Sequence, residues 1–73
     1  MPLGTEHQIS GRVERGPWGY ILCVRGGGVW ELDGGLSIRL RLRAARARRA
    51  EVRVEGERVG FNALWVRRVV VLD

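Results

Sequence analysis

Apolar and polar residues alternate in the last third of the chain, on both sides of a loop that contains glycine and asparagine. Val52 and Val54 are separated by charged residues, and Leu64 and Val66 repeat this spacing after the loop. Successive side chains of a β-strand point to opposite faces, so this period indicates strands that each bury one face. The pattern therefore predicts a closing hairpin. Its two strands cover residues 51–55 and 64–72.

The first half of the chain shows the same period in three segments. Ile9 and Val13 share one face of the first segment, and the second is rich in aromatic and β-branched residues, which favour strands. Gly16-Pro17 separates these two segments, because proline removes a donor of the strand ladder. Gly26–Gly28 provides a tight turn where positive φ angles cost little. The predicted strands cover residues 7–15, 18–25 and 29–33.

The segment 37–50 between these groups of strands fits two patterns. Its first half alternates apolar residues with arginines, which is the period of a strand. Ile38, Leu42 and Ala45 also fall at helical spacing, leucine, arginine and alanine are strong helix formers, and Ser37 could act as the N-cap. We predict a short helix with these three apolar residues facing the sheet. A strand over its first half is the alternative.

Three strands, a connector and two further strands are the element order of the OB-fold, a five-stranded, partly open barrel. A chain of 73 residues allows one domain with one core. Closing the sheet would also protect strand edges that so short a chain cannot otherwise cover. We predict an all-β fold, a small five-stranded OB-like β-barrel over residues 7–73. Residues 1–6 are expected to form a flexible N-terminal tail.

Four short motifs carry a resemblance to a known family. They are V-x-V-x-G from Val52, G-F-N-x-L-x-V from Gly60, G-x-V from Gly11 and W-x-L-D from Trp30. Over about residues 8–70 the chain resembles a family of small uncharacterised bacterial proteins with OB-like barrels. The resemblance implies a fold and no activity. The chain departs from the family pattern at outward-facing Trp65, where a polar residue is expected, and at Arg49, where a glycine usually precedes the V-x-V strand.

The positive charge is concentrated in the connector. The chain has a net charge of +5, and every basic side chain is arginine. Between Asp33 and Glu51 there are six arginines and no acidic residue, whereas seven arginines and eight acids make up the rest. A localised patch of this kind attracts phosphates or acidic partners, although charge runs are usually the solvated face of a helix. The patch consists of Arg39, Arg41, Arg43, Arg46, Arg48 and Arg49.

The inventory of reactive side chains argues against catalysis. The chain has one histidine, His7, and one cysteine, Cys23, so it offers neither a metal-ligand cluster nor a convincing pair of nucleophile and base. We expect Cys23 to act as a small buried apolar residue. No cofactor, catalytic residue or small-molecule substrate is expected. The N-terminus lacks the features of a signal peptide and no apolar run reaches a membrane span, so we predict a cytoplasmic protein.

Nucleic-acid binding is the leading functional hypothesis. Proteins that bind single strands without sequence preference combine a basic groove with aromatic side chains on which bases stack. In OB-folds the second and third strands and the adjoining loops form this surface. The candidate residues are Trp18, Tyr20, Arg25, Trp30 and, in the loop before the last strand, Arg58. Partners would be single-stranded DNA or RNA. The alternative roles are structural: Tyr20 and Trp30 as core residues, and Phe61 as a plug at one end of the barrel.

A second hypothesis is a protein-interaction or homo-oligomerisation module that uses the last strand. Trp65 lies between Leu64 and Val66, which should both point inward, so Trp65 should point outward. The segment Val69–Val71 is apolar on both faces, with Val70 pointing outward, and a strand of that kind requires cover on both sides. Binding of the arginine segment to acidic lipid headgroups ranks last, because the segment lacks large aromatic residues.

Overall fold

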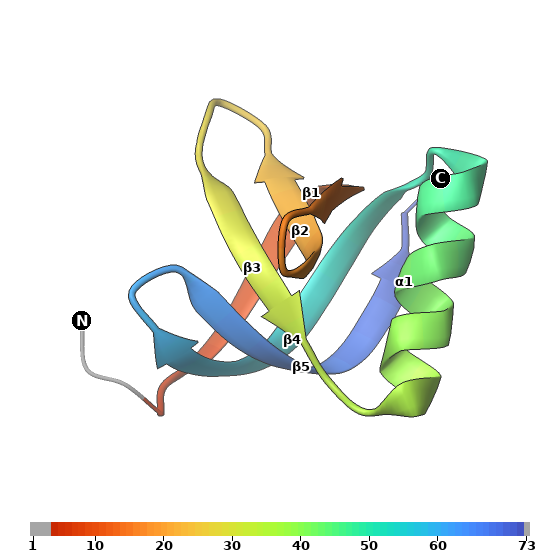
Figure 1. Ribbon diagram of the computed structural model, residues 1–73. Coiled ribbons are helices and arrows are strands. Elements are labelled where there is room, and N and C mark those ends of the chain that lie inside the picture. The colour runs from red at the N-terminus through yellow and green to blue at the C-terminus, as the bar shows by residue number, and fades with distance from the viewer. Residues whose placement is uncertain (1–3, 73) are drawn as a thin grey trace.

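The computed structural model describes residues 4–72, which form five strands and one helix (Figure 1). The predicted order of elements is confirmed. The elements are β1 (Glu6–Gly16), β2 (Gly19–Val24), β3 (Val29–Asp33), α1 (Leu36–Arg48), β4 (Glu51–Gly60) and β5 (Ala63–Val71).

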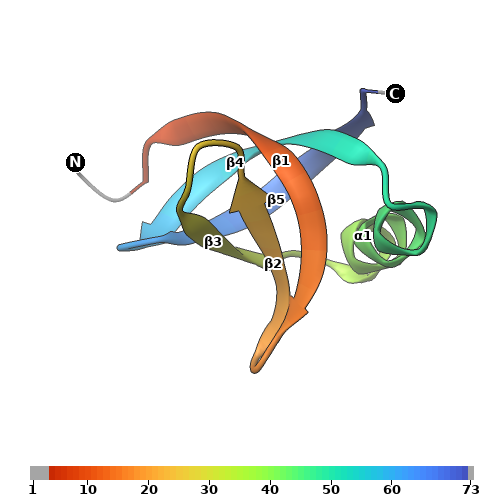
Figure 2. The ribbon, with the colours of Figure 1, turned by 90° about the horizontal axis from the view of Figure 1, so that it is seen from above.

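The five strands form one sheet that closes in a ring, seen from above in Figure 2. Its order is β1-β2-β3-β5-β4, and β4 pairs back onto β1. All pairs are antiparallel except β3 with β5, which runs parallel from Glu31 opposite Ala63 to Asp33 opposite Trp65. β1 takes part in two pairings: its first part pairs with β4 and its second part with β2. The long, curved β1 therefore closes the ring.

Two glycines permit the close strand contacts of this ring. A Cβ atom at Gly11, where β1 passes from β4 to β2, would lie 2.2 Å from the carbonyl oxygen of Cys23. A Cβ atom at Gly56 would lie 2.0 Å from the carbonyl oxygen of Trp65, at a register shift between β4 and β5. Small closed sheets need such glycines at their bends, because no side chain fits there.

The core lies inside the ring and beneath α1. Alternate residues of β4 and β5 point into it, as the sequence predicts. The largest fully buried side chains are Leu22, Leu42, Leu64, Val52, Val54 and Val66. Ile9, Tyr20, Val24, Trp30 and Val69 are partly buried and pack against this cluster. The expected core role of Tyr20 and Trp30 is therefore confirmed in part.

The connector is helical, which excludes the alternative of a strand over its first half. Ile38, Leu42 and Ala45 are its buried residues, as predicted. The prediction for the N-cap was wrong: Gly35 occupies that position, and no side chain caps the helix. At the other end Arg49 adopts a left-handed conformation with φ of 53°. Glycine favours this conformation, which explains why glycine is expected at this position.

Most predicted boundaries lie within two residues of the observed ones, and two differ by more. β4 continues to Gly60 instead of ending at Glu55, because two irregularities in its register let it follow β5 around the ring. Arg58 consequently lies in a strand and not in a loop. Of the predicted tail, residues 1–3 lie outside the described residues, whereas the Gly4 N–H donates to the Arg58 carbonyl and the Arg58 N–H to the Thr5 carbonyl. The chain is therefore already ordered by β4 before β1 begins.

Candidate functional site

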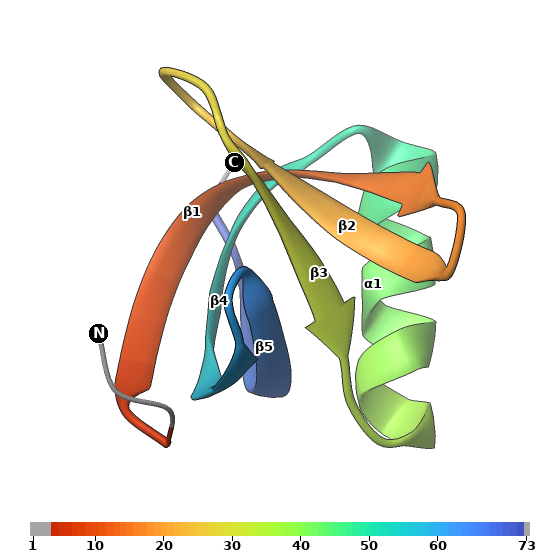
Figure 3. The same cartoon turned by 60° about the vertical axis from the view of Figure 1, so that its left-hand side comes forward.

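A groove crosses the outer face of β2 and β3 and ends at two turns. The turn between β1 and β2, with Pro17 and Trp18, forms one rim, and Asn62 in the turn between β4 and β5 forms the other. The groove encloses about 510 Å³. Figure 3 shows β2 and β3 side by side with α1 behind them. Arg39 of α1 also lines the groove, so one residue of the basic segment reaches this face.

The floor of the groove consists of side chains that the alternation along the strands directs outward. Leu22 and Leu32 are buried, so their neighbours Ile21 and Glu31 point outward. These two residues lie directly opposite each other in the pairing of β2 with β3, and Ala63 of β5 lies opposite Glu31 on the other side. The floor is thus a row of side chains from three adjacent strands, apolar except for Glu31.

Hydrogen bonds hold the Asn62 rim against β3. The side-chain amide of Asn62 donates to the Val29 carbonyl at 3.1 Å. The backbone N–H of Glu31 donates to the Asn62 carbonyl at 2.7 Å. The rim therefore stands at a fixed distance from the floor, and the asparagine of the G-F-N motif has a structural role.

Trp18 dominates the opposite rim. Its side chain is 88% exposed, because the turn between β1 and β2 carries it away from the core. An exposed indole beside a groove offers a flat apolar surface to a ligand. The charges around it are mixed: Arg39 is positive, and Glu31 and Asp33 are negative. Asp33 also accepts a hydrogen bond from the Gly34 N–H at 2.9 Å, which ties its carboxylate to the chain before α1.

The structure divides the predicted nucleic-acid residues into two groups. Trp18 and Tyr20 line the groove together. Arg25 lies outside it and forms an ion pair of 2.8 Å with Glu51. Trp30 and Arg58 belong to a separate cluster at the end of the ring near the turn between β4 and β5.

That cluster closes one end of the ring with an arginine. Arg58 is only 8% exposed; its Nε donates to the Gly60 carbonyl at 2.9 Å and its Nη2 to the Phe61 carbonyl at 2.6 Å. Its guanidinium carbon lies 5.9 Å from the ring centres of both Trp30 and Phe61. The ring of His7 lies 5.8 Å from that of Trp30. The prediction that Phe61 plugs the end was wrong, since Phe61 is 88% exposed and Arg58 fills this place.

The basic segment splits into two flanks of α1. On one flank, Arg46 and Arg49 line a shallow depression with Arg12 of β1, whose Nη1 donates to the Arg49 carbonyl at 2.7 Å. On the other, Arg41 lines a depression with Arg67 and Arg68 of β5. The arginines therefore do not form one continuous patch, because exposed apolar residues on the outer side of α1, among them Leu36 and Leu40, lie between the two flanks.

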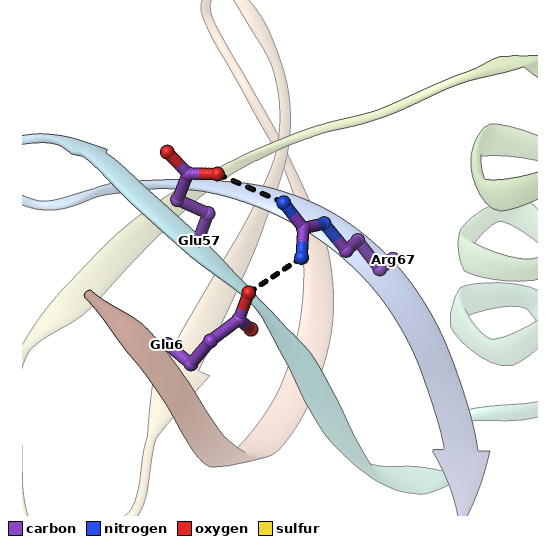
Figure 4. A network of polar contacts seen from close by, with 3 residues as sticks. All are labelled: Glu6, Glu57 and Arg67. Carbon is purple, nitrogen blue, oxygen red and sulfur yellow. Dashed lines mark hydrogen bonds and ion pairs between the residues drawn. The ribbon is translucent and has the colours of Figure 1, made fainter. Parts of the chain in front are cut away.

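The residues of the interaction hypothesis lie on the outer face of β5. Trp65 is 42% exposed and stands between Asp33 and Glu57 of the adjacent strands. Val70 lies opposite Arg53 and is half-buried, whereas Val69 packs against the core. Two residues after Trp65, Arg67 bridges Glu6 of β1 and Glu57 of β4 at 2.6 and 2.9 Å (Figure 4). Much of this face is therefore charged and internally paired.

Sequence reasoning missed most of the groove floor. Ile21 and Glu31 belong to the floor and Val59 and Asn62 line the groove beside it, and only their place in the folded sheet brings these residues together. The alternation of strand residues assigns Ile21 to the face opposite Leu22, but it does not show which outer face of the sheet is hollowed. Among residues 4–72 no group of three or more histidine, cysteine, aspartate or glutamate side chains could hold a metal ion. This part of the chain also contains no helix long and apolar enough to cross a membrane.

Comparison with known proteins places the chain in a family without a described activity. No curated protein and no solved structure matches it. The model of one family, described as a protein of unknown function (DUF5818), matches residues 10–71. That range extends from β1 to the end of β5 and includes the groove and the helix. The chain therefore belongs to the DUF5818 family of proteins of unknown function.

Proposed function

We propose that this chain is a non-catalytic OB-like barrel that binds single-stranded nucleic acid, weakly and without sequence preference, in the groove beside Trp18. The closed order β1-β2-β3-β5-β4, with a helix between β3 and β4, is consistent with an OB-fold. In that fold the ligand surface is the face of the second and third strands between the first and last turns. The groove has this position.

One observation carries the proposal: the 88% exposed Trp18 stands at the rim of a groove that Arg39 also lines. A base can stack on the indole while the guanidinium pairs with a neighbouring phosphate. Tyr20 and Ile21 extend the apolar surface along β2. The binding residues proposed from the structure are Trp18, Tyr20 and Arg39, with Trp30, Arg25 and Arg58 removed from the contact surface.

The two carboxylates of the groove constrain how a strand would lie. Glu31 and Asp33 would repel a phosphate placed over the floor. Carboxylates accept hydrogen bonds from the exocyclic amino groups of bases. A bound strand would therefore direct its bases toward the floor and its backbone toward Arg39 and the arginine flank of α1.

Fluorescence anisotropy with a labelled single-stranded oligonucleotide of mixed sequence tests this proposal. Trp18→Ala should weaken binding by about 5- to 150-fold, since a stacked base contributes about 1–3 kcal/mol. Arg39→Gln should weaken binding and lower its salt dependence. Trp65→Ala is the matched control, because Trp65 is also exposed but lies outside the groove lining. No binding at low salt, or an equal loss with both tryptophan variants, would overturn the proposal.

The second candidate function is homo-oligomerisation through β5. It is favoured by exposed Trp65 and by the short pairing of β5 with β3, which extends only from Ala63 to Trp65. Beyond Trp65, β5 and α1 together line a shallow depression, to which β5 contributes Val69, Val70 and Val71. Sedimentation velocity at high protein concentration tests it. A monomer whose sedimentation and solubility do not change with Trp65→Ser would rule it out.

A further inference from the structure

The helix α1 carries a second apolar stripe on the side that faces away from the sheet. Its inner stripe is Ile38, Leu42 and Ala45. On the outer side Leu36 is 75% and Leu40 54% exposed, and the exposed Ala44 and Ala47 continue their line. Figure 2 shows α1 nearly end-on, with the sheet on one side and no other element on the other. Two exposed leucines in line on a helix of this length mark a candidate interaction surface.

The spacing of the outer stripe is that of a helix-pairing seam. Leu40, Ala44 and Ala47 follow one another at intervals of four and three residues, the repeat by which one α-helix packs along another. The alanines lower the surface at one end of the stripe, so that a second helix can approach closely there, and the leucines supply apolar contact at the other end. The described helix has 13 residues, which is enough for a short two-helix contact.

Arginines border this stripe on both sides. Arg43 lies along one border, and Arg41 and Arg48 lie along the other, and all three are exposed. No acidic residue occurs in the helix or its flanking turns, from Gly34 to Ala50. Residues that border a helix-pairing seam select the partner by charge. The complementary surface is therefore an apolar stripe bordered by carboxylates on both sides.

We propose that the outer face of α1 binds an acidic amphipathic helix of another protein. A second copy of this chain would bring arginines against arginines along both borders, which is unfavourable. A nucleic acid would have to place phosphates over the two leucines, which prefer apolar contact. A membrane surface fits less well, because the stripe contains no tryptophan or phenylalanine and half of it is alanine.

The test uses a synthetic helical peptide with leucine at both seam positions of each heptad and glutamate at the bordering positions. Its control is a scrambled peptide of the same composition, which keeps the charge and loses the amphipathic pattern. Anisotropy should show binding of the first peptide and at least about tenfold weaker binding of the second. Leu40→Ser should weaken binding by about tenfold or more, and Arg43→Glu should do the same by reversing the charge of one border.

The remaining controls separate this surface from the groove. Trp18→Ala should leave peptide binding unchanged, and Arg68→Gln, a change of an exposed arginine outside α1, should alter it less than Arg43→Glu. Circular dichroism melting should show that both α1 variants remain folded, which their exposed positions favour. Equal binding of the scrambled peptide would overturn the proposal. Binding of single-stranded DNA or anionic vesicles that is lost in Leu40→Ser, in the absence of peptide binding, would overturn it as well.

Discussion

The interior of this very small ring is covered near both ends of β4, but by different kinds of interaction. Near Val52 the interior is covered by α1, whose Leu42 is fully buried with Ile38 and Ala45 around it. Near Gly60 the interior is covered by Arg58, which donates to two backbone carbonyls and whose guanidinium carbon lies 5.9 Å from the centres of two aromatic rings. The first end depends on apolar burial, and the second on hydrogen bonds of a charged group.

This difference relates to where the candidate site lies. The turn that Arg58 holds through the Gly60 and Phe61 carbonyls continues into Asn62, the rim of the groove. A polar end can fix the backbone of an exposed turn by direct hydrogen bonds, whereas an apolar end fixes only packing. The chain thus places its apolar closure under the helix and its polar closure beside the groove.

The largest effect is expected at the apolar end. Leu42→Ala should lower the free energy of unfolding by about 2–5 kcal/mol, because it removes a fully buried side chain and leaves a cavity. Leu40→Ala on the exposed side of the same helix is the matched control and should change stability by less than about 0.5 kcal/mol. Urea denaturation of both variants measures the contrast. Similar losses in the two variants would show that α1 does not present Leu42 to the core.

The polar end should respond more moderately. Arg58→Met keeps much of the side-chain volume but removes the donors to the Gly60 and Phe61 carbonyls. We expect a loss of about 1.5–3 kcal/mol, the range for hydrogen bonds of charged groups. Urea denaturation measures the loss, and hydrogen exchange of residues near the turn should increase. Unchanged stability would mean that packing alone closes this end, and the contrast between the two ends would then disappear.

A substitution at the C-cap of α1 should raise the free energy of unfolding instead of lowering it. Arg49→Gly should stabilise the protein by about 0.5–1 kcal/mol, because relief of the left-handed conformation, about 1–2 kcal/mol, exceeds the entropy cost of glycine. The hydrogen bond from Arg12 to the carbonyl of residue 49 can persist. Thermal unfolding measures the shift. Arg48→Gly, one residue earlier within the helix, should have the opposite sign, and equal signs would contradict the assigned cap.

The smallest effect is expected at Phe61. Phe61→Ala should lower the free energy of unfolding by no more than about 0.5 kcal/mol, since the ring is 88% exposed and lies beside the guanidinium of Arg58. Thermal unfolding of Phe61→Ala and of Arg58→Met under the same conditions separates the contributions of the two side chains to the stability of this end. A loss as large as that of Arg58→Met would restore Phe61 as the plug of the ring.

The site was only partly accessible to sequence reasoning. Trp18 was a candidate because a base can stack only on an accessible aromatic ring, and its side chain is 88% exposed. Arg58 was assigned to a loop because it lies between Gly56 and Gly60. Register irregularities in β4 keep it in the sheet instead. Arg39 lines the groove from the first turn of α1, which only two residues separate from the end of β3, and the alternation of residues did not show which side of the sheet this turn would reach.

The sequence was enough to predict five strands and the inward positions of Val52, Val54, Leu64 and Val66, and it favoured a helix between the third and fourth strands. These features depend on the period of apolar residues, which is a local property. The folded chain was needed to show which outer face is hollowed, which elements the arginines lie beside and which residue closes the far end of the ring. Those outcomes depend on ring closure and strand register, which bring together residues that are far apart along the chain.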